Sequence, residues 1–187
     1  MKKKILAVVN PRAASYLAGR KWQHVRRDLQ AAGFEVTGRF TEHRFHAADL
    51  ARGAAASGGI DVILSVGGDG TFNEVLNGLM ALGRPPDRMP ALGIISAGTG
   101  SDLARSLEIP ADHRRAAQVF RDGTPRWCDI GLARLSSGTQ IRTRYFANVL
   151  DAGLGGSVVR IANFIPKNLG GFLTFFLSSL AGLLTFK

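Results

Sequence analysis

The sequence predicts an α/β fold, a Rossmann-like parallel sheet with flanking helices, followed by the beginning of a β-rich second domain. Up to about Leu107, short apolar runs alternate with helical patterns, which is typical of right-handed strand–helix–strand units. After Pro110 this alternation stops, and two strand-like runs flank a Ser–Ser–Gly turn, which indicates an antiparallel hairpin. We therefore place a domain boundary near Gly123, between segments 1–123 and 124–187.

Each expected element has a local reason. The run 5–9 follows three lysines, but it is too short for a signal peptide and Asn10–Pro11 ends it, so we interpret it as a buried first strand. The run 61–66 is almost continuously apolar, as in a strand that is buried on both faces. The expected strands are 5–9, 34–40, 61–66 and 91–95, the expected helices are 17–32, 46–57, 72–82, one from near Thr99, and 112–121, and the hairpin strands are 127–135 and 141–150.

The composition is that of a globular protein with a basic surface. Hydrophobic residues make up 45% and charged residues 20% of the chain, which argues against disorder. The single cysteine, Cys128, excludes an internal disulfide and a cysteine metal cluster. The net charge of +10 favours polyanionic partners such as a nucleotide or an anionic membrane. Basic residues are not interleaved with aromatic ones, so we expect no nucleic acid partner.

The most informative segment is the loop 67–74, Gly-Gly-Asp-Gly-Thr-Phe-Asn-Glu, which directly follows a buried strand and opens a helix. Glycines let the backbone approach a phosphate closely, and the positive end of the helix dipole favours the same anion. A bare carboxylate such as Asp69 repels phosphate, so its presence makes sense where Mg²⁺ lies between the two. A second loop, 97–102, repeats the pattern after the next strand. Both loops are therefore expected to converge on one site.

A purely structural interpretation of these loops has to be weighed. A glycine turn after a strand is often only a tight connection, and Asp102 in such a turn is often only a helix N-cap. The spacing fits neither the P-loop nor the dinucleotide fingerprint. Two Gly–Asp loops after neighbouring strands, with Glu74 one helical turn beyond the first, favour the functional interpretation.

At these residues the sequence resembles the diacylglycerol kinase catalytic-domain family, which includes bacterial lipid kinases and sphingosine kinases. The segment 67–75 resembles the hallmark of that family, and 98–105 resembles its second motif. The likeness continues through 129–131 and 145–148, and it extends over essentially the whole chain. The fold it implies is the N-terminal domain that NAD kinases share with diacylglycerol kinases.

The resemblance implies transfer of the γ-phosphoryl group of ATP to a lipid hydroxyl, with Mg²⁺ as the metal. It makes Asp69 the expected catalytic residue and an indirect metal contact. The nucleotide contacts that it implies are Asn10, Pro11, Thr41, Gly67, Gly68, Asp69, Gly70, Thr71, Phe72, Asn73, Glu74, Gly98 and Thr99.

The sequence departs from the family pattern in three places. The first turn reads Pro11–Arg12–Ala13–Ala14 where the family usually has a serine and a glycine, and Ser101 replaces a common asparagine. In the family a mainly β second domain continues beyond the equivalent of Lys187 and supplies the acidic general base. We therefore expect an incomplete enzyme, in which 124–187 is the start of a lipid-acceptor domain.

Two other functions stay open on the sequence alone. One is an NAD kinase-like small-molecule kinase, because NAD kinases share a Gly-Gly-Asp-Gly-Thr loop. The other is a nucleotide-binding module without catalysis, because the expected base is missing. The second loop, 98–105, favours the lipid kinase.

The apolar tail 169–186 bears on location. It is nearly long enough to span a bilayer, but hydroxyl residues and glycines interrupt it. Shallow docking at a membrane surface, where the lipid substrate lies, is therefore favoured over a span. We expect a cytoplasmic protein in peripheral contact with a membrane, and a homodimer is left open.

Overall fold

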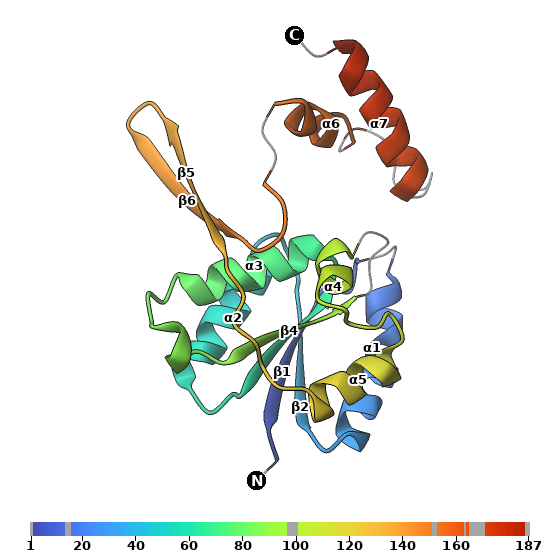
Figure 1. The fold of residues 1–187 in the computed structure, drawn as a ribbon, viewed down its shortest axis with the longest axis vertical. Coiled ribbons are helices and arrows are strands. Elements are labelled where there is room, and N and C mark those ends of the chain that lie inside the picture. The colour runs from blue at the N-terminus through green and yellow to red at the C-terminus, as the bar shows by residue number, and fades with distance from the viewer. Residues whose placement is uncertain are drawn as a thin grey trace. The chain divides into compact units, whose positions relative to one another are not determined.

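The computed structural model describes residues 2–13, 16–96, 101–150, 153–162, 164 and 171–185. The chain divides into two compact units, Met1–Asn148 and Val149–Lys187. The first contains a four-stranded parallel sheet, its helices and a two-stranded hairpin, and the described part of the second contains two helices (Figure 1).

The parallel sheet confirms the expected fold class. Its strands lie in the order β2-β1-β3-β4, so the chain moves outward from β1 to β2 and then returns past β1 to β3. The direction of the connections therefore reverses between β1 and β3, which is where sheets of this kind bind ligands, at the carboxyl ends of the strands. The strands are β1 (Lys4–Val9), β2 (Glu35–Phe40), β3 (Val62–Gly67) and β4 (Ala91–Ser96).

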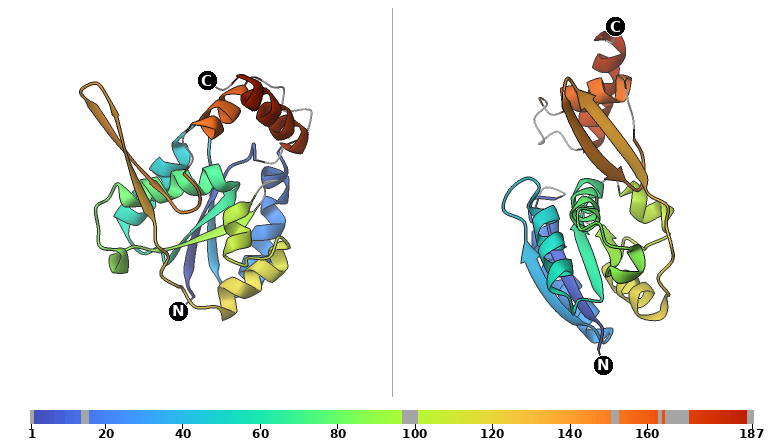
Figure 2. Two further views of the ribbon diagram at one scale, coloured as in Figure 1. Left: turned by 45° about the horizontal axis from the view of Figure 1, so that its top comes forward. Right: turned by 90° about the vertical axis from the view of Figure 1, so that its left-hand side faces the viewer.

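Helices cover both faces of this sheet (Figure 2). Residues of β1 alternate between two cores: Ile5 and Val9 pack with α1 and α5, whereas Leu6 and Val8 pack with α2 and α3. This double burial explains why the strand is continuously apolar, since each such side chain contributes about 1.5–3 kcal/mol when fully buried. The helices of the first unit are α1 (Leu17–Ala31), α2 (His46–Ser57), α3 (Asp69–Met80), α4 (Asp102–Ser106) and α5 (His113–Asp122), with a 3₁₀ turn η1 (Pro86–Arg88).

The predicted start of α3 was wrong. The helix begins at Asp69, three residues before the expected Phe72, and Gly68 in an extended conformation is its N-cap. Most of the glycine loop is therefore the first turn of a helix. An acidic residue is favourable there because the N-terminal end of a helix is positive.

The hairpin was predicted in type but not in extent. It consists of β5 (Gly131–Ser137) and β6 (Gln140–Phe146), which project as a ribbon in Figure 1. The expected first strand began at Trp127, which is instead outside the strand and 80% exposed. The turn contains Gly138, whose φ of 58° suits glycine. The hairpin belongs to the same compact unit as the parallel sheet, and the functional boundary near Gly123 stays a prediction.

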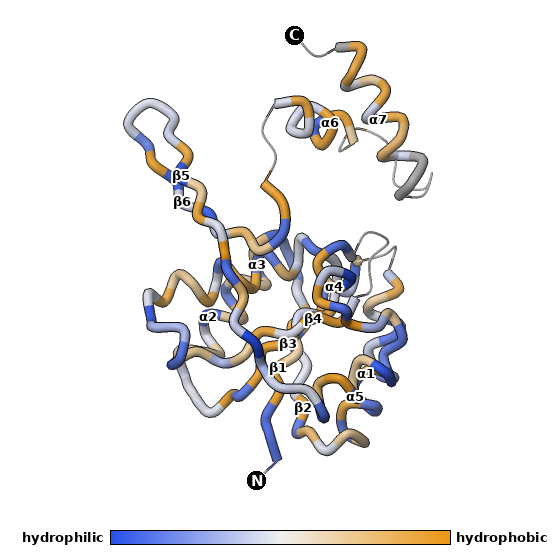
Figure 3. Tube along the Cα trace, in the orientation of Figure 1, coloured by the Kyte–Doolittle hydropathy of each residue, from blue (hydrophilic) through white to orange (hydrophobic). Residues whose placement is uncertain are grey.

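The described part of the second unit includes α6 (Leu154–Ala162) and α7 (Gly171–Thr185). Gly182 of α7 packs against Val158 of α6, where a β-carbon would come within 2.8 Å of a Val158 methyl group. Figure 3 shows the described part of α7 as largely hydrophobic. Across the described ranges, none of the helices combines the length and the apolar character that crossing a bilayer requires.

Candidate functional site

The glycines of the first loop differ in whether packing excludes a side chain at their positions. A β-carbon on Gly67 would lie 2.6 Å from Thr71 Oγ1, so the packing of the turn excludes a side chain there. A β-carbon on Gly68 or Gly70 would meet nothing within 4 Å, and neither residue has a positive φ. The fold itself therefore requires no glycine at these two positions. They keep open the space in front of the first turn of α3.

Hydrogen-bond donors border this open space. The N–H groups of Thr71 and Phe72 donate to the Gly68 carbonyl, at 3.0 and 3.2 Å. The N–H groups of Asp69 and Gly70 have no acceptor among the residues that the structure describes. Two free donors at the positive end of a twelve-residue helix are suited to an anion.

A hydrogen bond joins the loop after β1 to the helix after β3, at the position where the direction of the sheet connections reverses. Asn10, directly after β1, donates from Nδ2 to Thr71 Oγ1 in α3 at 3.0 Å. Its Oδ1 accepts the Arg12 N–H at 3.1 Å, which fixes the side chain in an Asx turn. Thr41 lies beside Asn10, because its N–H donates to the Val9 carbonyl at 2.9 Å. Pro11 lies against the first turn of α1, next to Gly19.

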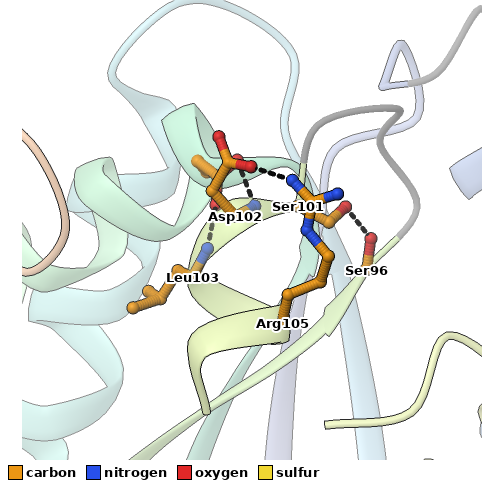
Figure 4. Close-up of polar contacts among 6 residues, drawn as sticks. Ser96, Ser101, Asp102, Leu103 and Arg105 are labelled. Atoms are coloured by element: carbon orange, nitrogen blue, oxygen red, sulfur yellow. Dashed lines mark hydrogen bonds and ion pairs between the residues drawn. The ribbon is translucent and has the colours of Figure 1, made fainter. Parts of the chain in front are cut away.

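Asp69 connects the first glycine loop to the helix that follows the second. Its carboxylate accepts the N–H groups of Asp102 and Leu103, at 3.3 and 3.1 Å, and so caps α4. Figure 4 shows Asp102 and Leu103 at the start of α4, with Arg105 folded back beside Asp102 and Ser101 facing Ser96. The negative charge of Asp69 therefore lies against α4 and not against the free N–H groups of α3.

Two asparagines of α3 hold the hairpin. Asn77 donates to the Tyr145 carbonyl at 2.9 Å and accepts the Tyr145 N–H at 3.0 Å. Asn73 donates to the same carbonyl at 3.0 Å. Because the two asparagines are four residues apart, they lie on one face of the helix, directed at β6. The side chain of Asn73, a predicted nucleotide contact, is thus committed to the hairpin, and Asn77 is a residue that the sequence analysis missed.

Unusual backbone conformations gather at the carboxyl edge of the sheet. Tyr16, Phe45 and Ser101, the N-cap residues of α1, α2 and α4, have positive φ values of 72°, 67° and 54°. N-cap residues ordinarily adopt β-region angles, and a bulky residue with a positive φ is strained by about 1–3 kcal/mol. Such strain is concentrated at functional sites, which adds weight to this edge as the site.

The structure brings most of the predicted residues to this edge. Asn10, Thr41, Gly67, Gly68, Asp69, Gly70 and Thr71 lie in the loops after β1, β2 and β3 or in the first turn of α3. Phe72 is buried in the core with Leu76 and Ile94, so its side chain has a packing role. Glu74 lies one turn further along α3 and is partly buried. Gly98 and Thr99 lie outside the described residues.

The residues that the structure describes contain no cluster of three or more His, Cys, Asp or Glu side chains that could bind a metal by themselves. Mg²⁺ is usually bound by one or two carboxylates together with substrate phosphates. Asp69 by itself could supply the single carboxylate of that binding mode. Each of its carboxylate oxygens accepts an N–H group from α4 and keeps a further lone pair.

Comparison with known proteins agrees with this geometry. Residues 4–133 match the family model described as the diacylglycerol kinase catalytic domain. A diacylglycerol kinase of Staphylococcus saprophyticus is 34% identical over 171 residues, which are 90% of this chain and 50% of that protein. One of Bacillus subtilis is 34% identical over 168 residues, 89% of this chain and 50% of that protein.

A solved structure gives the same result. The crystal structure of a diacylglycerol kinase from Bacillus anthracis aligns with a TM-score of 0.55 and 27% identity, over 71% of this chain and 44% of that one. The chain spans about half the length of the curated relatives that it matches. These matches confirm the resemblance carried by the two glycine loops.

Proposed function

The chain belongs to the diacylglycerol kinase catalytic domain family, and on this premise we propose that it binds ATP for phosphoryl transfer to a lipid hydroxyl. In that reaction the lipid oxygen bonds to the γ-phosphorus, the bond to the β–γ bridging oxygen breaks, and ADP leaves. The hydroxyl proton passes to a base. Because the chain spans half of its relatives, the transfer and the acceptor are both part of the proposal.

One observation carries the nucleotide half of the proposal. The free N–H groups of Asp69 and Gly70 face a space that Gly68 and Gly70 leave open, although the fold requires glycine at neither position. A phosphate chain placed there would accept both N–H groups and lie at the positive end of α3. A side chain at Gly68 would occupy the same space. The open space therefore has a chemical reason that packing does not supply.

The remaining residues have supporting roles in this proposal. Asn10 and Thr41 border the phosphate position from the loops after β1 and β2. Asp69 would contact the metal of the bound nucleotide, and Mg²⁺ would neutralise phosphate charge during transfer. The capping bonds from Asp69 to α4 also join the two glycine loops into one unit. Phosphoryl transfer depends mainly on positioning and charge neutralisation, and residues fixed by these hydrogen bonds would supply the positioning.

The lipid half of the proposal draws on the second unit. The large side chains of α7 include Phe175, Phe176, Leu183 and Leu184, which are 55–79% exposed. Together with the net charge of +10, this apolar surface supports peripheral docking at an anionic membrane, where a lipid acceptor lies.

The test combines nucleotide binding with label transfer. We expect the chain to bind MgATP, and Gly68→Val to weaken that binding by about a hundredfold while the melting temperature stays unchanged. Gly53→Val is the matched control, because Gly53 also has open space around it but lies in the middle of α2. An equal loss of affinity and stability in Gly68→Val would indicate a purely structural turn.

Transfer of labelled γ-phosphate separates the remaining functions. Label in diacylglycerol supports the lipid kinase, and label in NAD⁺ supports the NAD kinase-like alternative. ATP binding without transfer to either acceptor identifies a nucleotide-binding module. Each result is compared with the Gly68→Val variant, whose weaker nucleotide binding should reduce any transfer at sub-saturating ATP.

A further inference from the structure

Two arginines from distant parts of the chain meet on one exposed aromatic ring. The guanidinium carbon of Arg44 lies 4.8 Å from the centroid of the Phe45 ring, and that of Arg144 lies 5.2 Å from it. Arg44 and Phe45 belong to the loop between β2 and α2, whereas Arg144 comes from β6. All three residues lie in the first compact unit, and the ring itself is 44% exposed.

The backbone of Phe45 indicates that this ring is there for more than packing. Its φ is 67°, in the left-handed region that favours glycine, and a bulky side chain is rare there. The ring is not buried in a core that would offset the strain. The observed gain from phenylalanine is the surface on which both guanidinium groups lie. A strained, exposed residue of this kind is typical of a functional position.

The backbone next to Arg144 is held in place by hydrogen bonds. Its neighbour Tyr145 is held through both main-chain polar groups by Asn77 of α3. The chain segment that contains the hairpin has no aspartate or glutamate between Asp129 and Asp151. β6 therefore delivers a positive charge to the Phe45 ring without delivering a negative one.

Neither arginine has a carboxylate partner within the described ranges. The ion pairs of the described residues involve other arginines and His113, and the nearest acid in sequence, Glu42, contributes its N–H group to His46. Two positive charges therefore lie on one ring without an ion pair to either among the described residues, and an anion would offset their charge. Planar guanidinium groups match the oxygens of phosphate in fork geometry, and arginine stacked on an aromatic ring is pre-organised for that contact.

We propose that Arg44 and Arg144, ordered by the Phe45 ring, form a phosphate-binding site separate from the first turn of α3. The ligand is a phosphate group, either free or carried by a phospholipid headgroup. The site uses side-chain guanidinium donors, whereas the glycine loop uses backbone N–H groups. It rests on contacts that do not involve the glycine loop, so it stands whether or not the proposed kinase activity is correct.

The first experiment is a titration of the chain with inorganic phosphate at constant ionic strength, followed by the Nε–Hε signals of the arginines in NMR spectra. We expect saturable shifts at Arg44 and Arg144. Arg144→Gln should weaken binding by about tenfold, the loss of one charge-assisted contact. The matched control is Arg134→Gln, which removes the same charge from the opposite face of the same hairpin and should bind phosphate normally.

Phe45→Gly makes the test independent of folding. Glycine accepts the left-handed backbone, so this variant should be at least as stable as the original chain while it binds phosphate about tenfold more weakly. Gly68→Val serves as the second control, because it should lose MgATP and keep this site. Unchanged phosphate binding in both Phe45→Gly and Arg144→Gln would overturn the proposal.

Vesicles distinguish the two sources of the phosphate. Binding to phosphatidylglycerol vesicles that depends on Arg44 and Arg144, and that phosphatidylcholine vesicles do not reproduce, identifies an anionic lipid headgroup. If inorganic phosphate binds through Arg44 and Arg144 but vesicle binding does not depend on them, the ligand is a free phosphate. If Arg144→Gln changes neither phosphate affinity nor vesicle binding, the arginines only stack on Phe45, and the site does not exist.

Discussion

A β-carbon on Gly78 would lie under 3.0 Å from the carbonyl oxygen of Ala48, whereas one on Gly68 or Gly70 would meet nothing within 4 Å. The first position belongs to the body of the sheet and its helices, where α2 and α3 pack closely through alanine and glycine. The others lie at the carboxyl edge. In the body a neighbour explains Gly78, although Gly53 on α2 has open space around it. At the edge no neighbour explains Gly68 or Gly70, whereas a group that binds there would.

The same contrast holds for other residues. In the body, Gly38 lies against Trp22 and Gly93 against Phe120, so both are required by rings of the core. At the edge, Phe45 has a positive φ without being buried. Stability should therefore depend on body residues and ligand binding on edge residues. The following variants test that separation.

The largest expected effect is on stability, from Gly78→Ala. The new methyl group would force α2 and α3 apart at the Ala48 backbone, which cannot move as a side chain can. We expect a loss of about 3 kcal/mol or more in the free energy of unfolding. Urea denaturation measures it. A variant as stable as the original chain would show that the two helices separate easily and that the body is not closely packed.

Asn77→Ala should have the next largest effect. It removes both hydrogen bonds to the Tyr145 backbone, and we expect about 2 kcal/mol of lost stability. Hydrogen exchange at the Tyr145 amide should accelerate, while exchange in β1 and β3 changes little. Asn77→Asp keeps an acceptor for the Tyr145 N–H but places a carboxylate oxygen against the Tyr145 carbonyl, so it should destabilise the hairpin at least as much. Slow exchange at Tyr145 in both variants would mean that the hairpin is held elsewhere.

Asp69→Asn tests whether this residue of the carboxyl edge also contributes to the stability of the fold. The amide keeps one acceptor for the N–H groups of α4, so stability should fall by only about 1 kcal/mol. Nucleotide binding in the presence of Mg²⁺ should fall toward the metal-free affinity, because the charge near the metal is gone. Calorimetric titration of ADP with and without Mg²⁺ measures this. If Mg²⁺ does not improve binding to the original chain, Asp69 is only a helix cap.

The smallest effect on stability has the opposite sign. Gly70→Ala lies in the first turn of α3 with open space around it, so we expect a gain of about 0.5 kcal/mol together with weaker nucleotide binding. Gly53→Ala in α2 should give a similar gain with unchanged binding. Thermal melts and ADP titration compare the two. Equal nucleotide affinity in both would remove Gly70 from the site.

Much of the fold could be predicted from local sequence patterns. The buried run of β3, the helix-period pattern of α1 and α2 and the turn at Gly138 were readable because burial and backbone preference are properties of neighbours in sequence. The glycine loops were readable for the same reason, since close backbone approach leaves its mark on consecutive residues. The start of α3 was misjudged because glycines suggested a loop where Asp69 and Gly70 are already helical.

Contacts between distant residues were decided only in three dimensions. The sequence showed strand–helix alternation but not the strand order β2-β1-β3-β4, which places Asn10 beside Thr71. Asp69 appeared as a metal contact, and the fold turned its carboxylate to α4. The pairing of Asn77 with Tyr145 and of Phe45 with Arg144 joins segments far apart in the chain. Periodicity records whether a side chain is buried, but not which side chain it meets, because that depends on how whole elements pack.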